Sequence, residues 1–119
     1  MIETFFIAEP RRELVIRWTL KFEGVIGELR LDCSGEISSL YVRKGYRRDG
    51  YGRSLVRRAF KEAEASGLED LAVRIPVFDG RENAVAFFKH CGFSEVTGSE
   101  FIPPIGFMGM KCAVEDFMA

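Results

Sequence analysis

Ile37-Ser-Ser-Leu-Tyr-Val-Arg-Lys-Gly-Tyr-Arg-Arg-Asp-Gly-Tyr-Gly-Arg-Ser-Leu-Val56 is the stretch that decides the fold. Its first six residues are rich in β-formers and predict a strand that ends at Val42. Its last residues begin a helix, because apolar side chains recur at helical spacing: Leu55, Val56, Ala59, Phe60 and Ala63. Between strand and helix lie two glycines one residue apart, Gly50 and Gly52, which let the backbone come close to a ligand.

The turn between this strand and this helix has the features of a phosphate site. The first N–H groups of a helix lack intrahelical partners, and the helix dipole adds partial positive charge there. The charges agree: seven basic residues stand between Arg43 and Arg58 against one acid, Asp49, whereas the whole chain has a net charge of −1. A basic focus on an acidic protein favours a compact polyanionic ligand. The alternative is a solvated, arginine-rich helix face.

Length and composition set the class of protein. The 119 residues predict a single domain over 1–119 with a core of its own. No run approaches the roughly 20 apolar residues of a membrane helix, and Met-Ile-Glu-Thr does not resemble a signal peptide. The cysteines, Cys33, Cys91 and Cys112, are odd in number and far apart, so we expect reduced thiols, a cytoplasmic protein and no metal site.

The order of elements predicts a mixed α/β, or α+β, fold. Residues 1–8, 14–22, 25–33 and 36–42 read as antiparallel strands. A helix follows from about Tyr51 to Ser66-Gly67, then a strand over 71–77 and a short helix that ends at Gly92. Residues 93–97 and 107–114 read as a last pair of strands. The long helical crossover implies one parallel pair in a mostly antiparallel sheet, with a ligand crevice beyond the strand ends.

These residues resemble the GNAT superfamily of N-acetyltransferases over roughly residues 14–114. The family motif for acetyl-CoA, Gln/Arg-x-x-Gly-x-Gly/Ala after a strand ending in Val, stands here as Arg47-Arg-Asp-Gly-Tyr-Gly52 after Val42. The following helix, strand, short helix and Gly92-Phe93 fit the same order. The resemblance implies a central mixed, mostly antiparallel sheet with a splayed parallel strand pair and two or three helices.

The resemblance also implies where acetyl-CoA binds. Its pyrophosphate would lie on the backbone of the turn, its pantetheine arm beside the end of the first strand, and a backbone N–H near Val42 would stabilise the oxyanion. Asn83 is the asparagine nearest to one that contacts coenzyme A in the family. The complete expected coenzyme site is Tyr41, Val42, Arg47, Arg48, Asp49, Gly50, Tyr51, Gly52, Arg53, Ser54, Asn83 and Phe88.

Glu36 is the candidate catalytic base, because the resemblance places a catalytic Glu six residues before Val42. The alternative is a solvated carboxylate at the start of a strand. Strict alternation would put Glu36 on the same face as Ser38, Leu40 and Val42. The family's tyrosine acid is replaced by Phe88, whose plainer role is core packing. Cys91 or His90 could supply a proton instead, although each is more often structural.

A further departure is the short N-terminus, because the family usually places one or two helices between its first two strands. Their absence, with the apolar segment 101–107, predicts an open acceptor site or a homodimer. The leading hypothesis is an acetyl-CoA-dependent N-acetyltransferase acting on a small amine, a lysine or a protein N-terminus by direct attack in a ternary complex. A non-catalytic acyl-CoA sensor is the alternative. Nucleic-acid binding fits less well, because the overall charge is negative.

Overall fold

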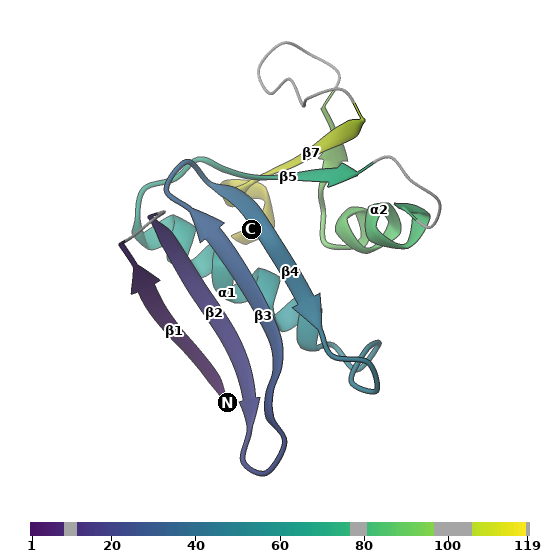
Figure 1. Cartoon of the computed structure of the whole chain (residues 1–119). Coiled ribbons are helices and arrows are strands. Elements are labelled where there is room, and N and C mark those ends of the chain that lie inside the picture. Colours follow the sequence, from purple (N-terminus) through teal and green to yellow (C-terminus); the bar gives the residue numbers. More distant parts are fainter. Residues whose placement is uncertain (9–11, 77–80, 97–105, 119) are drawn as a thin grey trace.

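The chain folds around one mixed sheet with strand order β1-β2-β3-β4-β5-β7-β6 (Figure 1). The computed structural model describes residues 1–8, 12–76, 81–96 and 106–118. The strands are β1 (Ile2–Ile7), β2 (Glu13–Leu20), β3 (Gly24–Asp32), β4 (Glu36–Val42), β5 (Asp70–Pro76), β6 (Ser94–Glu95) and β7 (Phe107–Ala113). The helices are α1 (Tyr51–Ala65), α2 (Arg81–His90) and α3 (Val114–Met118). The mixed α+β fold expected from the sequence is confirmed.

Strands β1 to β4 form the predicted antiparallel meander, and each pairs with the next along the chain. The prediction for the faces of β4 was wrong, because the β3–β4 register shifts where Leu31 pairs with Ile37 and Arg30 with Ser39. Ser38 is therefore the extra residue of a β-bulge, and a bulge inverts which side chains face which side. Ile37 and Leu40 both pack on the core, so Glu36 points to the opposite face.

Helix α1 covers one face of the sheet, behind β2, β3 and β4 in Figure 1. Its apolar stripe is buried as its periodicity predicts: Leu55, Val56, Ala59, Phe60 and Ala63. The helix ends where expected, because Gly67 adopts a φ of +75° and Leu68 donates its N–H to the carbonyl of Ala63. The core lies between α1 and the sheet, and Phe60 stacks on Phe117 of α3 there.

The opposite face of the sheet carries a row of ion pairs. Arg17 Nε lies 2.7 Å from one oxygen of Glu28, and Arg30 Nε lies 3.1 Å from the other. Arg30 also reaches the buried Glu13, at 3.3 Å. Partial burial would raise the pKa of Glu28, but hydrogen bonds and charge from Arg17 and Arg30 outweigh it and lower that pKa. Charged side chains therefore line this face between β2 and β3.

The C-terminal half completes the sheet. Strand β5 pairs with β7 along its whole length, and β7 pairs with β6. Strand β6 is shorter than the predicted 93–97, because Phe93 is buried in the core and residue 97 lies outside the described residues. The predicted strand 107–114 ends at Ala113, and Val114 begins α3. The described helices include none long and apolar enough to cross a membrane.

Candidate active site

The parallel strands β4 and β5 separate soon after they meet. They pair at Glu36 with Ala72 and at Ile37 with Val73, and at no other positions among the described residues. Beyond these positions the strands diverge, and α2 lies in the angle between them (Figure 1). From Ser38 to Val42, the edge of β4 that faces β5 is therefore left without a strand partner in the described part of the chain. Such an edge can pair with an extended ligand.

The turn of residues 43–50 opens onto the start of α1 at the wide end of this angle. Gly50 precedes the helix in a left-handed conformation, φ +86°, which favours glycine. It offers no side chain to cap the first N–H groups of α1, and the first turn contains no acid. A Cβ at Gly50 would have no heavy atom within 4 Å. The N-terminus of α1 thus has room, free donors and a favourable dipole for an anion.

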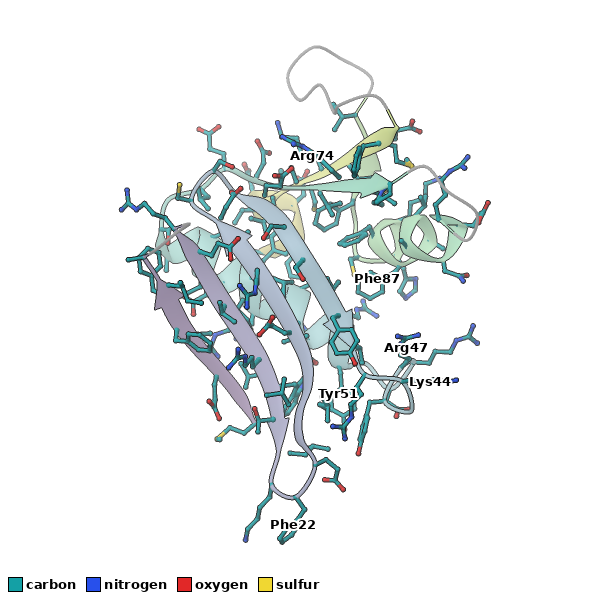
Figure 2. The ribbon with its side chains drawn as sticks, viewed as in Figure 1. Phe22, Lys44, Arg47, Tyr51, Arg74 and Phe87 are labelled. Carbon is teal, nitrogen blue, oxygen red and sulfur yellow. The ribbon has the colours of Figure 1, made fainter. Side chains whose placement is uncertain are left out.

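Basic side chains surround this turn, and two of them hold it in place. Arg47 donates from Nε to the carbonyl of Val42 at 2.9 Å, and Arg43 donates to the carbonyl of Glu23 at 2.9 Å. Arg48 adopts a φ of +67°, and its side chain, like those of Asp49 and Arg53, is exposed. Figure 2 shows Lys44 and Arg47 at the same end of the sheet. The predicted basic focus is therefore gathered around one helix terminus.

Three aromatic rings connect the turn to the sheet. Tyr51, the first residue of α1, makes edge contacts with Trp18 of β2 at 5.4 Å and with Tyr46 at 6.1 Å between ring centroids. Arg43 lies over the ring of Tyr46 at 5.1 Å. Tyr51 thus anchors the turn, while Tyr41 is 49% exposed on β4. The N–H of Ser54 closes the first helical bond, to the carbonyl of Gly50 at 3.0 Å.

Gly52 leaves room at the start of α1 for a side chain that comes from α2. A Cβ at Gly52 would lie 3.3 Å from the ring of Phe87 and 3.5 Å from the side chain of Val42. The ring of Phe87 therefore lies against Gly52, close to the side chain of Val42 at the end of β4. The sequence analysis missed Phe87 and selected its neighbour Phe88. The only sequence signal for it is Gly52, which lacks a side chain where a ring must fit.

The two predicted coenzyme residues on α2 lie in different surroundings. Phe88 is 5% exposed and packs in the core, with edge contacts to Phe87 and Phe93. This is the packing role considered for it above. Asn83 is exposed in the first turn of α2. Of the two, only Asn83 has its side chain at the surface.

The two candidates considered as proton donors also differ. Cys91 is buried in the core, and burial raises the pKa of its thiol, only partly opposed by the charge of Arg53. Burial likewise raises the pKa of Cys112. His90 is exposed at the end of α2. The described residues bring no three His, Cys, Asp or Glu side chains together as a metal site.

Glu36 lies near the point where β4 and β5 meet, far from the turn. Its Oε1 is 2.7 Å from Arg74 Nε, and the Glu36 side chain is 19% exposed. The N–H of Arg74 is not aimed at this buried oxygen, so the contact is an ion pair rather than an aligned hydrogen bond. Glu36 borders a cavity of about 580 Å³. In Figure 2, Arg74 marks the end of the sheet opposite to Arg47.

Comparison with known proteins adds the family. The model of the acetyltransferase (GNAT) family matches residues 4–93. A GNAT-family acetyltransferase of Staphylococcus aureus Mu50 is 15% identical, with a TM-score of 0.73, over 86% of this chain and 68% of that one. An aminoglycoside 6′-N-acetyltransferase complexed with coenzyme A is 14% identical, with a TM-score of 0.75, over 90% of this chain and 75% of that one. A Bacillus anthracis protein solved in complex with acetyl coenzyme A is 20% identical, with a TM-score of 0.72, over 91% of this chain and 65% of that one. No curated protein matches the chain.

Proposed function

The chain belongs to the GNAT family of acetyltransferases, and on this premise we propose that it is an acetyl-CoA-dependent N-acetyltransferase. It would transfer the acetyl group to an amine by direct attack in a ternary complex. One observation carries the proposal: the open, uncapped and basic N-terminus of α1 stands at the wide end of the angle between β4 and β5. The three reduced cysteines fit a cytoplasmic enzyme.

The residues of the turn would hold coenzyme A through its phosphates. The N–H groups of residues 50–53 would donate to the pyrophosphate, with Arg48, Arg53 and the remaining nitrogens of Arg47 close by. Asp49 and Ser54 belong to the same segment. The free edge of β4 at Tyr41 and Val42 would pair with the amides of the pantetheine arm, and Asn83 would face it from α2. A backbone N–H near Val42 would donate to the carbonyl oxygen as charge develops there.

The acceptor amine must lose a proton to become a nucleophile, and Glu36 is the proposed base. The nitrogen forms a bond to the acetyl carbon while the C–S bond of the thioester breaks. The proton lost to make the amine nucleophilic passes to Glu36, directly or through a water molecule. A second N–H proton leaves to solvent as the amide forms, and the thiolate takes a proton from solvent. A proton from solvent is consistent with Phe88, whose ring stands where the family usually has a tyrosine and cannot donate a proton. Arg74 would hold the Glu36 carboxylate in position.

Calorimetric titration of acetyl-CoA into the protein tests the phosphate turn. The Gly50→Glu variant puts a negative charge at the helix N-terminus and should weaken binding by at least about tenfold. Gly24→Glu is the matched control, because Gly24 also has a positive φ and open space but is the first residue of β3, outside the turn of residues 43–50. Equal acetyl-CoA affinity in the two variants would contradict the assignment of this turn as the phosphate site.

An amine panel, with released coenzyme A thiol as the readout, tests the reaction. We expect Glu36→Gln to lower kcat by roughly 10²-fold or more and to leave acetyl-CoA affinity unchanged. Turnover by Glu36→Gln at the wild-type rate would remove the base assignment.

A non-catalytic acyl-CoA sensor is the second candidate function. The observation in its favour is that Phe88 replaces the family's tyrosine acid and is buried in the core. Tight acetyl-CoA binding without acetyl transfer to any amine of the panel would support the sensor over the enzyme.

A further inference from the structure

The cavity beside Glu36 is built from three strands and the loops that precede two of them. It measures about 580 Å³ and lies where β4, β5 and β7 meet. Arg74, on its wall, comes directly after Val73, the last residue of β5 that pairs with β4. The cavity therefore reaches the point where the two parallel strands begin to separate. Its charged lining residues are Glu36, Glu69, Asp70, Arg74 and Lys111.

Charged groups of both signs line this cavity. Glu36 of β4 pairs with Arg74 of β5 at 2.7 Å, and Asp70 of β5 pairs with Lys111 of β7 at 3.3 Å. Glu69 adds a further exposed carboxylate. A ligand here therefore meets carboxylates and cationic groups in alternation across neighbouring strands.

This mixture decides which ligand fits. A simple amine in its ammonium form would be attracted by the carboxylates but repelled by Arg74 and Lys111. A simple anion would be attracted by Arg74 and Lys111 but repelled by the carboxylates. Ion pairs open to water contribute little to stability, so a ligand that carries both charges can exchange into them. Both pairs here are partly exposed: the side chains of Arg74 and Asp70 are 44% and 37% exposed.

We propose that this cavity is the acceptor site and that the acceptor is an amino-acid zwitterion, a small amine that also carries a carboxylate. The inference rests on the proposed N-acetyltransferase function. The carboxylate would bind Arg74 and Lys111, and the amino group would bind beside Glu36 and Asp70. The ammonium group loses one proton to Glu36, and its nitrogen then bonds to the acetyl carbon as the C–S bond breaks. A second N–H proton leaves to solvent as the amide forms, the thiolate takes up a proton from solvent, and the carboxylate of the acceptor is unchanged.

A binding experiment tests this without requiring turnover. Lysine and cadaverine, and phenylalanine and phenethylamine, are titrated by NMR into protein saturated with coenzyme A, each pair differing only in the carboxylate. The amino acid of each pair should bind about tenfold more tightly, and Arg74→Gln or Lys111→Gln should reduce that ratio to roughly threefold or less. Arg17→Gln is the matched control, because Arg17 makes a 2.7 Å pair with Glu28 through the same Nε outside the cavity.

The outcomes separate the two proposals. Equal binding within each pair, or no binding of any of these compounds at millimolar concentration, would overturn the zwitterion site. A ratio that falls as much in Arg17→Gln as in Arg74→Gln would also overturn it. Selective binding of the amino acids without acetyl transfer would instead leave the site standing and remove the proposed enzymatic function.

Discussion

Gly35 joins the two parallel strands through a contact that a larger residue could not make. Its φ is +93°, and a Cβ there would lie 2.7 Å from the carbonyl oxygen of Asp70. Its own carbonyl accepts a hydrogen bond from Ala72 at 2.9 Å. Because the clashing atom is backbone, it cannot move aside without separating β4 from β5.

We therefore expect Gly35→Ala to lower the free energy of unfolding by more than about 3 kcal/mol. Gly24→Ala is the control, since Gly24 has a φ of +75° with nothing within 4 Å, and should cost only the conformational term of about 1–2 kcal/mol. Urea denaturation measures both. Equal losses in the two variants would contradict a steric role for Gly35.

Glu28 makes the free energy of unfolding depend on pH in the acidic range. Hydrogen bonds and charge from Arg17 and Arg30 overcome the effect of burial and hold its pKa below the ordinary 4.5. The ionised carboxylate thus favours the folded state above about pH 4.5, and this stability is lost as the pH falls through the lowered pKa. Glu28→Gln should flatten the fall in unfolding free energy between about pH 6 and pH 3. An unchanged slope in denaturation curves would argue against this role.

Single residues also show what sequence can and cannot give. Gly50 was predicted at the helix start because glycines there let the backbone come close to a ligand. Its φ of +86°, a left-handed conformation that favours glycine, came from the structure. The neighbour of Gly52 was not predictable, because Phe87 lies far along the chain and its ring meets Gly52 only in the folded structure.

The contact between α1 and α2 can be tested as a pair. Gly52→Val should push the ring of Phe87 aside, lower the free energy of unfolding by about 1–3 kcal/mol and weaken acetyl-CoA binding. Phe87→Ala in the same chain should restore part of the loss, with a coupling of about 1 kcal/mol in a double-mutant cycle. If the changes in unfolding free energy of the two variants simply add, Gly52 and Phe87 do not interact energetically.

Elements were predictable where local signals agree. The bounds of α1 were predicted from its apolar periodicity and from Gly67 at its end, and the structure confirms them. The inverted face of β4 was not predictable, because the bulge at Ser38 depends on the pairing with β3 and on bonds from the Ser38 hydroxyl to Glu13 and Arg30. Consequently the face of Glu36, and with it the candidate acceptor side, came only from the structure.

At the scale of the molecule, the sheet order follows from the alternation of strands and helices, but the surfaces that remain open do not. Phe6 is 57% exposed and Phe107 is 40% exposed. The dimer prediction rested on the missing N-terminal helices and on the apolar segment 101–107, of which residues 101–105 lie outside the described residues.

We predict a homodimer that uses the surface around Phe107, because large exposed apolar side chains favour association. Light scattering should give twice the monomer mass for the wild type and the monomer mass for Phe107→Asp. Phe22→Asp is the control, because Phe22 is 88% exposed at the tip of the β2–β3 turn (Figure 2) and should leave the mass unchanged. A monomeric wild type at high concentration would refute the dimer.

The contrast between the cysteines has a practical consequence. Cys33 is exposed, whereas Cys91 and Cys112 are buried and have raised pKa values. Cys33 also directly precedes Ser34, which lines the cavity beside Glu36. A maleimide fluorophore should therefore attach to the native sequence at one position, adjacent in sequence to a residue that lines that cavity. The same thiol will add a constant background to any colorimetric assay of released coenzyme A, so a labelled or blocked Cys33 improves both experiments.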